Sequence, residues 1–148
     1  MSQQGMAGRE DPATAMVSVV IPTYNRARFL GEALQSVFEQ THANFEILLV
    51  DDGSTDDTAR VIDRFASDER LRHWFQEHQG QAVARNRGLA AARGDFVCFL
   101  DSDNRWLPHK LEVSLREFAA HPEADIVYSD TILIDEAGRE FDRPRQVR

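Results

Sequence analysis

Three apolar segments of this 148-residue chain are each followed at once by a polar cluster that could hold a ligand. The clusters are Pro22-Thr23-Tyr24-Asn25, Asp51-Asp52-Gly53-Ser54 and Asp101-Ser102-Asp103. Each cluster alone is typical of a turn, because Asp, Asn, Ser and Gly are common turn-forming residues. Three such clusters in one chain, each directly after an apolar run, instead indicate a shared ligand site.

Asp101 and Asp103 carry the clearest chemistry. They are two residues apart, so in extended backbone both carboxylates project to the same side while Ser102 points away. Two facing carboxylates repel each other unless one is protonated or a cation lies between them. Hard oxygen ligands suit Mg²⁺ or Mn²⁺, which proteins often bind together with substrate phosphates. The pair therefore predicts a divalent cation site, although a D-x-D pattern is frequent by chance.

The composition limits the partners. With 42% hydrophobic and 28% charged residues, the chain has the composition of one compact domain. Its formal net charge of -8 would repel a nucleic acid backbone, so we expect no nucleic acid partner. The single cysteine, Cys98, lies in an apolar run and is expected to be a small buried hydrophobe. The five histidines are expected to be structural or surface residues, and no thiolate zinc site is predicted.

Strands and helices are predicted to alternate along the chain. Residues 17–21 form a β-branched apolar strand that Pro22 should end, because proline cannot continue a central strand. Apolar runs predict further strands at 45–50, 71–75 and 96–100, with additional strand segments at 125–129 and 131–134. Apolar residues at three- and four-residue spacings predict helices at 28–40, 59–66, 82–92 and 108–120.

This alternation predicts an α/β fold, in which a Rossmann-like, mostly parallel sheet carries helices on both faces. Ligands of such open sheets bind beyond the carboxyl ends of the strands, where loops from neighbouring crossovers meet. All three polar clusters follow predicted strands. We therefore expect their side chains to meet at that edge.

The order V-S-V-V-I-P-T-Y-N-R, L-V-D-D-G-S-T-D-D-T, A-R-N-R-G and D-S-D resembles family 2 glycosyltransferases of the GT-A fold, from about Val17 to about Asp135. The resemblance implies an enzyme that uses Mn²⁺ or Mg²⁺ and a nucleoside-diphosphate sugar, expected to be UDP-linked. It implies transfer of the sugar, with inversion, to a saccharide or lipid-linked acceptor in cell-envelope polysaccharide synthesis.

The resemblance also divides the chain and assigns its residues. Residues 1–15 are polar, contain glycine and show no periodicity, so they are expected to be a disordered leader. The resemblance makes 16–136 a truncated nucleotide-sugar-binding domain and 137–148 a polar tail or the start of a missing acceptor-binding region. Tyr24 would lie against the base, and Asp52 would accept a hydrogen bond from an N–H of uracil or thymine, which cytosine lacks. Asp51 is expected only to cap its turn. The implied nucleotide-binding residues are Pro22, Thr23, Tyr24, Asn25, Asp52, Arg85, Asn86 and Asp101, and the implied metal ligands are Asp103 and Asp101.

Some points of the family pattern are missing. Asn104 stands where the family often has an acidic residue, which would weaken or retune the metal site. The family's general base comes from a later segment, so none is assigned, and Asp130, Asp135 and Glu136 are expected to be surface carboxylates. The alternative to an enzyme is a non-catalytic nucleotide-sugar-binding module or subunit. A nucleotidyltransferase would need a glycine-rich, basic loop after the first strand, and residues 22–25 do not supply one.

The sequence contains no apolar stretch near the ~20 residues needed to span a bilayer, and its first residues lack the pattern of a secretory signal. We therefore expect no transmembrane segment. The expected location is the cytoplasm, either free or peripheral at the inner membrane face. The sequence leaves the sugar, the acceptor and the oligomeric state open.

Overall fold

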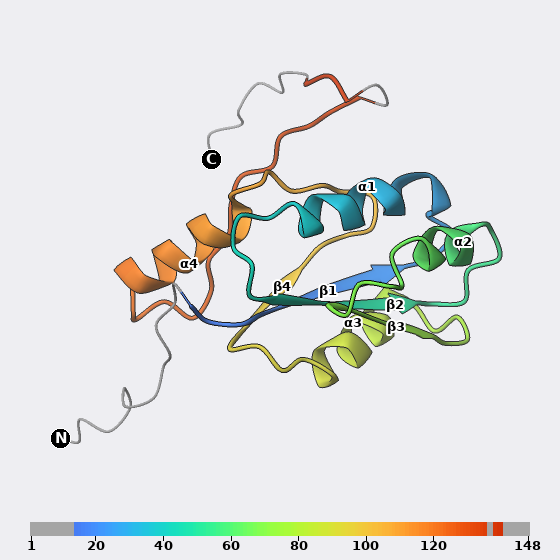
Figure 1. Cartoon of the computed structure of the whole chain (residues 1–148), viewed down its shortest axis with the longest axis horizontal. Helices are drawn as coiled ribbons and strands as arrows, with labels where there is room; N and C mark the ends of the chain where they lie inside the picture. The colour runs from blue at the N-terminus through green and yellow to red at the C-terminus, as the bar shows by residue number, and fades with distance from the viewer. Residues whose placement is uncertain (1–13, 136–137, 141–148) are drawn as a thin grey trace.

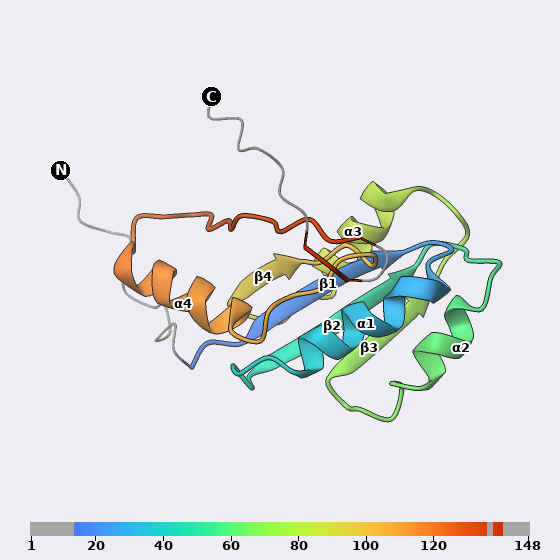
Figure 2. The same ribbon diagram turned by 90° about the horizontal axis from the view of Figure 1, so that it is seen from above.

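The computed structural model describes residues 14–135 and 138–140. Within them, strands and helices alternate and all four strands are parallel, in the order β3-β2-β1-β4 (Figures 1 and 2). The predicted α/β class with a parallel sheet is confirmed. The elements are β1 (Val17–Thr23), α1 (Ala27–Phe38), β2 (Phe45–Asp51), α2 (Thr58–Asp63), β3 (Leu71–Phe75), α3 (Gln81–Ala90), β4 (Phe96–Phe99) and α4 (Lys110–Ala120).

Helices cover both faces of the sheet, as predicted. Successive residues of a strand point to opposite faces, so Val17, Val19 and Ile21 of β1 enter one core together with side chains of α1, α2 and α4. Helix α3 lies on the opposite face (Figure 1), where a Cβ on Gly88 would lie only 2.5 Å from Cγ1 of Val20. Glycine at this position therefore lets α3 pack directly on β1.

Pro22 does not end the first strand, so that prediction is wrong. Strand β1 is central and continues to Thr23, with Pro22 in register with Val50. The backbone of Val20 faces β4, because its carbonyl accepts from the N–H of Leu100 at 3.1 Å, and Pro22, two residues on, faces the same way. Since the β1–β4 pairing ends at Val20, the missing N–H of Pro22 removes no ladder hydrogen bond.

The strands predicted at 125–129 and 131–134 are absent. Of these residues only Ile134 pairs, in an isolated bridge with Glu140, and the segment runs back from α4 as an irregular stretch (Figure 2). Ile126 and Tyr128 are 80% and 89% exposed. An apolar run becomes a strand only where a neighbour pairs with its backbone, and the described residues place no such neighbour beside this segment.

Strand β4 is short and lies at an edge of the sheet. Cys98 is therefore only partly buried, although burial is still sufficient to raise the pKa of its thiol above the usual value. Helix α4 begins at Lys110, two residues after Pro108, where its start was predicted. Among the described residues, no helix has the length and apolar character required to span a membrane.

Candidate functional site

The loops that follow the four strands meet at the carboxyl edge of the sheet. The backbone N–H of Gly80 donates to Oδ2 of Asp52 at 2.8 Å. The next residue, Gln81, donates from Nε2 to Oδ1 of Asp101 at 3.2 Å. Two consecutive residues after β3 thus connect the carboxylates that follow β2 and β4, so the convergence expected from the strand order is present.

Asp103 belongs to the same edge. Its Oδ2 lies 3.5 Å from Nε of Arg26, in the loop after β1. The backbone N–H of Arg26 in turn donates to Oγ1 of Thr58, at the start of α2, at 3.2 Å. The loop after β4 is therefore tied to the loop after β1, and Asp103 is about half exposed at this point.

Asp101 and Asp103 do not lie in extended backbone, so the alternation argument used to place them together is wrong. Strand β4 ends at Phe99, and the N–H of Asn104 donates to the carbonyl of Asp101 at 2.9 Å, which closes a turn. The two carboxylates have separate partners: Asp101 contacts Arg85, and Asp103 contacts Arg26. They share an edge of the sheet because of the loop fold, not because of strand geometry.

Asp52 is buried and all of its acceptor positions are occupied. Its side chain accepts from Nε2 of Gln76 at 2.7 Å and from the N–H groups of Gln79 and Gly80 at 2.9 and 2.8 Å. Nδ1 of His78 lies 2.8 Å from Oδ2. Burial alone would raise the pKa of Asp52, but these hydrogen bonds outweigh burial and hold the pKa below its ordinary value. The carboxylate is therefore ionised at neutral pH.

His78 is a site residue that the sequence interpretation missed. Its ring stacks on Tyr24, with centroids 4.0 Å apart and planes inclined by 22°. The histidines were expected to be structural or surface residues, and polar clusters were predicted after only three of the strands. A further polar cluster, Gln76-Glu77-His78-Gln79-Gly80, follows β3. The rule that ligand-binding groups follow the strands of a parallel sheet would have selected it.

Two buried side-chain atoms among the described residues lack a hydrogen-bond partner, and both belong to predicted nucleotide-binding residues. They are Oγ1 of Thr23, at the end of β1, and Nε of Arg85. Another nitrogen of the same guanidinium, Nη2, lies 2.5 Å from Oδ1 of Asp101. Arg85 is the fifth residue of α3, so it lies beyond the helix start at which it was predicted. Asn86 is exposed on the same helix. Unpaired buried polar atoms are rare in folded proteins and suit a site that a ligand completes.

The loops after β1 and β2 hold each other in place. Asn25 has a positive φ of 52°, and its Oδ1 accepts from the N–H of Thr55 at 2.8 Å. Asp51 accepts from the N–H of Ser54 at 2.9 Å, as expected of a turn cap. Gly53, at φ 85°, would carry a Cβ 2.8 Å from the backbone N of His78, so glycine allows the loop after β3 to close onto this turn. These residues shape the site.

A cation at this edge would need ligands from outside the chain. In the part of the chain that the structure describes, no three His, Cys, Asp or Glu side chains converge. Mg²⁺ and Mn²⁺ need only one or two carboxylates when substrate phosphates complete their coordination, so Asp101 and Asp103 have the donor chemistry for such a site. Asn104 is exposed beside them. Asp130 is exposed, Asp135 pairs with Arg139, and Glu136 lies outside the described residues.

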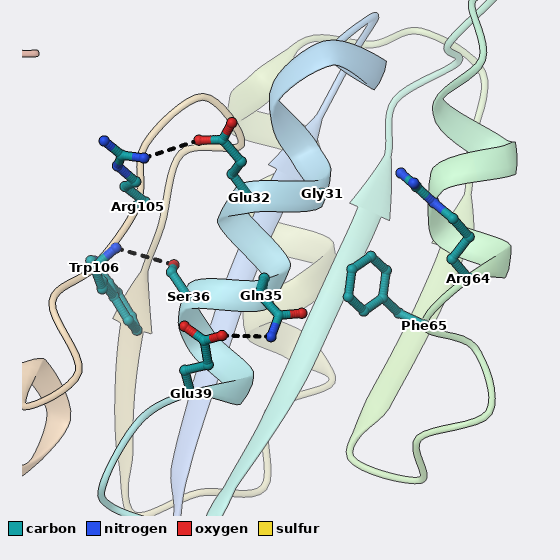
Figure 3. A pocket seen from close by; sticks show the side chains of 9 residues that line it. All are labelled: Gly31, Glu32, Gln35, Ser36, Glu39, Arg64, Phe65, Arg105 and Trp106. Atoms are coloured by element: carbon teal, nitrogen blue, oxygen red, sulfur yellow. Dashed lines mark hydrogen bonds and ion pairs between the residues drawn. The ribbon is translucent and has the colours of Figure 1, made fainter. Parts of the chain in front are cut away.

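A hollow of about 480 Å³ lies elsewhere, on the outer side of α1 (Figure 3). It contains the ion pair of Arg105 with Glu32 and a hydrogen bond from the N–H of Trp106 to Ser36, at 3.2 and 3.1 Å. None of the predicted nucleotide or metal residues lines it. Arg105 and Trp106 follow Asp103 in the loop after β4, but the other lining residues lie in or directly after α1 and α2, so we do not assign the hollow to the candidate site.

Two solved structures are similar to the chain. TarS of S. aureus in complex with UDP matches with a TM-score of 0.68 and 32% identity, over 72% of this chain and 33% of TarS. The mannosyltransferase PcManGT of Pyrobaculum calidifontis, in complex with GDP-Man and Mn²⁺, matches with a TM-score of 0.60 and 32% identity, over 70% of this chain and 32% of PcManGT. The fold is accordingly that of the GT-A glycosyltransferases, and the chain spans about one third of the length of these two.

Sequence relatives agree with the structural ones. WfgD of Escherichia coli, a UDP-Glc:alpha-D-GlcNAc-diphosphoundecaprenol beta-1,3-glucosyltransferase, is 41% identical over 68% of this chain and 40% of its own length. The chain spans between 17% and 51% of the length of the first curated relatives it matches. The sequence model of Glycosyl transferase family 2 matches residues 18–147. The chain therefore belongs to glycosyl transferase family 2.

Proposed function

We propose that the chain is the donor-binding part of a glycosyltransferase and holds a UDP-sugar at the carboxyl edge of its sheet. The observation that carries this proposal is the pair of unpartnered buried atoms, Oγ1 of Thr23 and Nε of Arg85. Thr23 is the last residue of β1 and Arg85 lies in α3, and both atoms offer hydrogen bonds that no described residue uses. A diphosphate or ribose oxygen would satisfy them.

The base is proposed to stack on Tyr24 and to donate an N–H to Asp52. Tyr24 is 40% exposed at the end of β1, and Asp52 is an ionised acceptor at the end of β2. Uracil carries this N–H on its ring atom N3, whereas N3 of cytosine is an acceptor. The name of WfgD includes UDP-Glc, and the TarS structure contains UDP, which supports uracil, whereas PcManGT was solved with GDP-Man.

Asp103 and Asp101 are proposed to hold Mn²⁺ or Mg²⁺ together with the diphosphate, and Asp101 to contact the ribose as well. Both carboxylates are partly exposed and already lie beside arginines, Arg26 and Arg85. The bound cation would stabilise the departing nucleoside diphosphate. The presence of Mn²⁺ in the PcManGT complex supports the choice of cation. The two arginines would lie close enough to neutralise part of the phosphate charge.

For the whole protein we propose sugar transfer with inversion to a saccharide or lipid-linked acceptor in envelope polysaccharide synthesis. The reaction needs a general base for the acceptor hydroxyl, and no described residue is assigned that role. The name of WfgD includes a diphosphoundecaprenol acceptor, and another relative is named for teichuronic acid biosynthesis. The proposed location is the cytoplasm or its membrane face. A non-catalytic donor-binding subunit is the alternative, and absence of transfer by the full-length protein would favour it.

Calorimetry with UDP, GDP and CDP, each with and without Mn²⁺, tests the proposal. We expect micromolar-to-millimolar UDP binding that depends on Mn²⁺, and weaker binding of CDP because the ring N3 of cytosine carries no N–H to donate to Asp52. Preference for GDP or CDP over UDP would overturn the base assignment. Absence of binding by all three nucleotides, in protein whose circular dichroism shows it folded, would overturn the site itself.

A further inference from the structure

The ring of His78 occupies the position that the proposed function gives to the base. It stacks on Tyr24 with a centroid separation of 4.0 Å. Its Nδ1 lies 2.8 Å from Oδ2 and 3.0 Å from the backbone carbonyl of Asp52. A flat ring that stacks on Tyr24 and donates an N–H to Asp52 is also the description of a bound uracil. The imidazole thus has the same two partners that a uracil would have.

Asp52 cannot accept a new donor while its present ones remain. A carboxylate offers about four lone-pair positions, and four donors from this chain already surround Asp52, which is 2% exposed. A base N–H can therefore reach Asp52 only if one of the four donors leaves. The donor that leaves most easily is one that belongs to an exposed side chain and not to the backbone or to a buried side chain.

His78 is the donor best placed to leave. The N–H groups of Gln79 and Gly80 belong to the backbone, and Gln76 is buried at 8% exposure. The His78 side chain, by contrast, is 54% exposed. Its backbone is held against Gly53, so a rotation about its side-chain bonds releases the ring without moving the loop. Departure of the ring uncovers both the face of Tyr24 and one oxygen of Asp52.

We propose that His78 is an internal competitor for the nucleobase: its imidazole fills the base position in the ligand-free protein and swings out when a uridine nucleotide binds. This inference rests on the proposed function, because it assumes that the base stacks on Tyr24. The competitor keeps the buried carboxylate paired while the site is empty. It also lowers the apparent affinity for the donor, because each binding event must break the contacts of His78 with Tyr24 and Asp52.

His78→Ala tests the proposal by calorimetry with UDP and Mn²⁺. Loss of one hydrogen bond and one ring stack from the empty site is expected to tighten UDP binding roughly 5- to 30-fold. His109→Ala is the matched control, because His109 is also an exposed histidine beside a carboxylate, with Nδ1 3.3 Å from Glu112 in α4. The control is expected to bind UDP as the wild type does. Unchanged or weaker binding by His78→Ala would overturn the proposal.

A second measurement follows the His78 ring in wild-type protein. It is independent of any change that the alanine substitution causes in the loop. In wild-type protein, proton NMR is expected to show a nuclear Overhauser effect between the rings of His78 and Tyr24, which lie 4.0 Å apart. This effect should disappear on saturation with UDP and Mg²⁺, a diamagnetic cation that does not itself broaden the ring signals. If it persists in the saturated protein, His78 is not displaced and the inference is wrong. If no nucleotide binds to wild type or variant, the proposed function fails, and the inference fails with it.

Discussion

Arg26 and Asp103 face each other across the carboxyl edge of the sheet, with Nε of one 3.5 Å from Oδ2 of the other. The pair joins the loop after β1 to the loop after β4, and both side chains are about half exposed. An ion pair this exposed contributes only about 0–1 kcal/mol to stability. A cation with its phosphate ligands can therefore replace Arg26 beside Asp103 at little cost to the fold.

Asp103→Asn should separate cation binding from folding. Because the carboxylate has only an exposed partner, the free energy of unfolding should change by less than about 1 kcal/mol. UDP affinity in Mn²⁺ should fall at least about tenfold, since an amide is a weaker ligand than a carboxylate. Asp95→Asn is the control, because Asp95 is exposed at the amino end of β4. Equal UDP affinities in the two variants would argue against Asp103 as a ligand.

Arg85→Lys should weaken nucleotide binding without unfolding the protein. Lysine keeps the charge beside Asp101 but lacks the planar guanidinium, and with it the buried Nε that has no partner. We expect UDP affinity to fall roughly tenfold, the equivalent of one hydrogen bond to a charged group. Calorimetry and thermal unfolding of the same samples measure both effects. If Arg85→Lys binds UDP with wild-type affinity, Nε of Arg85 does not contact the nucleotide.

Much of the fold could be predicted from sequence because hydrophobic periodicity reports which residues are buried. The four strands and four helices of the described residues lie within a few positions of their predicted ranges. The strand predictions at 125–134 failed because an apolar run reveals burial potential and not the presence of a pairing neighbour. The prediction for Pro22 failed for a related reason. Whether its missing N–H costs a ladder hydrogen bond depends on where the pairing with β4 ends, and the sequence alone does not show this.

The convergence of the predicted loops at one edge followed from the sequence, but the contacts within that edge did not. Strand order brought the loops of Asp52 and Asp101 to one edge, as expected for parallel strands. The turn at Asp101 and the stacking of His78 depend on contacts between loops, which no periodicity reports. Asn25, predicted to bind the nucleotide, bonds to Thr55, and its role toward a ligand stays a prediction.

Gly88→Ala should destabilise the protein through the packing of α3. The new Cβ would lie 2.5 Å from Cγ1 of Val20, so the helix must move away from β1, at a cost of about 1–3 kcal/mol. Gly31→Ala in α1 is the control, because its Cβ would meet the flexible end of Arg64 at 3.3 Å and Cγ1 of Val61 at an ordinary 3.8 Å. That change should be neutral or stabilising by up to about 1 kcal/mol. Urea unfolding measures both values, and equal stabilities would contradict the packing role of Gly88.

Glu46→Gln should alter the acid end of the stability profile. Burial alone would raise the pKa of Glu46, but hydrogen bonds from Ser18, Arg93 and Arg72 outweigh it and hold the pKa below the ordinary 4.5. A depressed pKa stabilises the fold above pH 4.5, and this contribution is lost as pH falls through the folded-state value. The variant should lose about 1–3 kcal/mol at neutral pH.

The difference between wild type and Glu46→Gln should then shrink as the pH falls below 4.5, because the protonated glutamic acid gains no charge-assisted hydrogen bonds. Urea unfolding at pH 7, 5 and 3.5 measures this trend. A difference that grew toward acid would mean that the pKa is raised instead. UDP binding should be unchanged, because Glu46 is the second residue of β2, far along the strand from Asp51 and Asp52.

Paramagnetic broadening by Mn²⁺ in the presence of UDP tests the central claim most directly, because it reports where the cation and nucleotide bind. In ¹H–¹⁵N spectra we expect the amide signals of Gly53 and Gly80, at the carboxyl edge, to broaden only when UDP and Mn²⁺ are both present. The signals of Gly31, beside the hollow of Figure 3, and of Gly94, before β4, should stay sharp. Broadening of Gly31 or Gly94 with Gly53 and Gly80 unaffected would contradict the account.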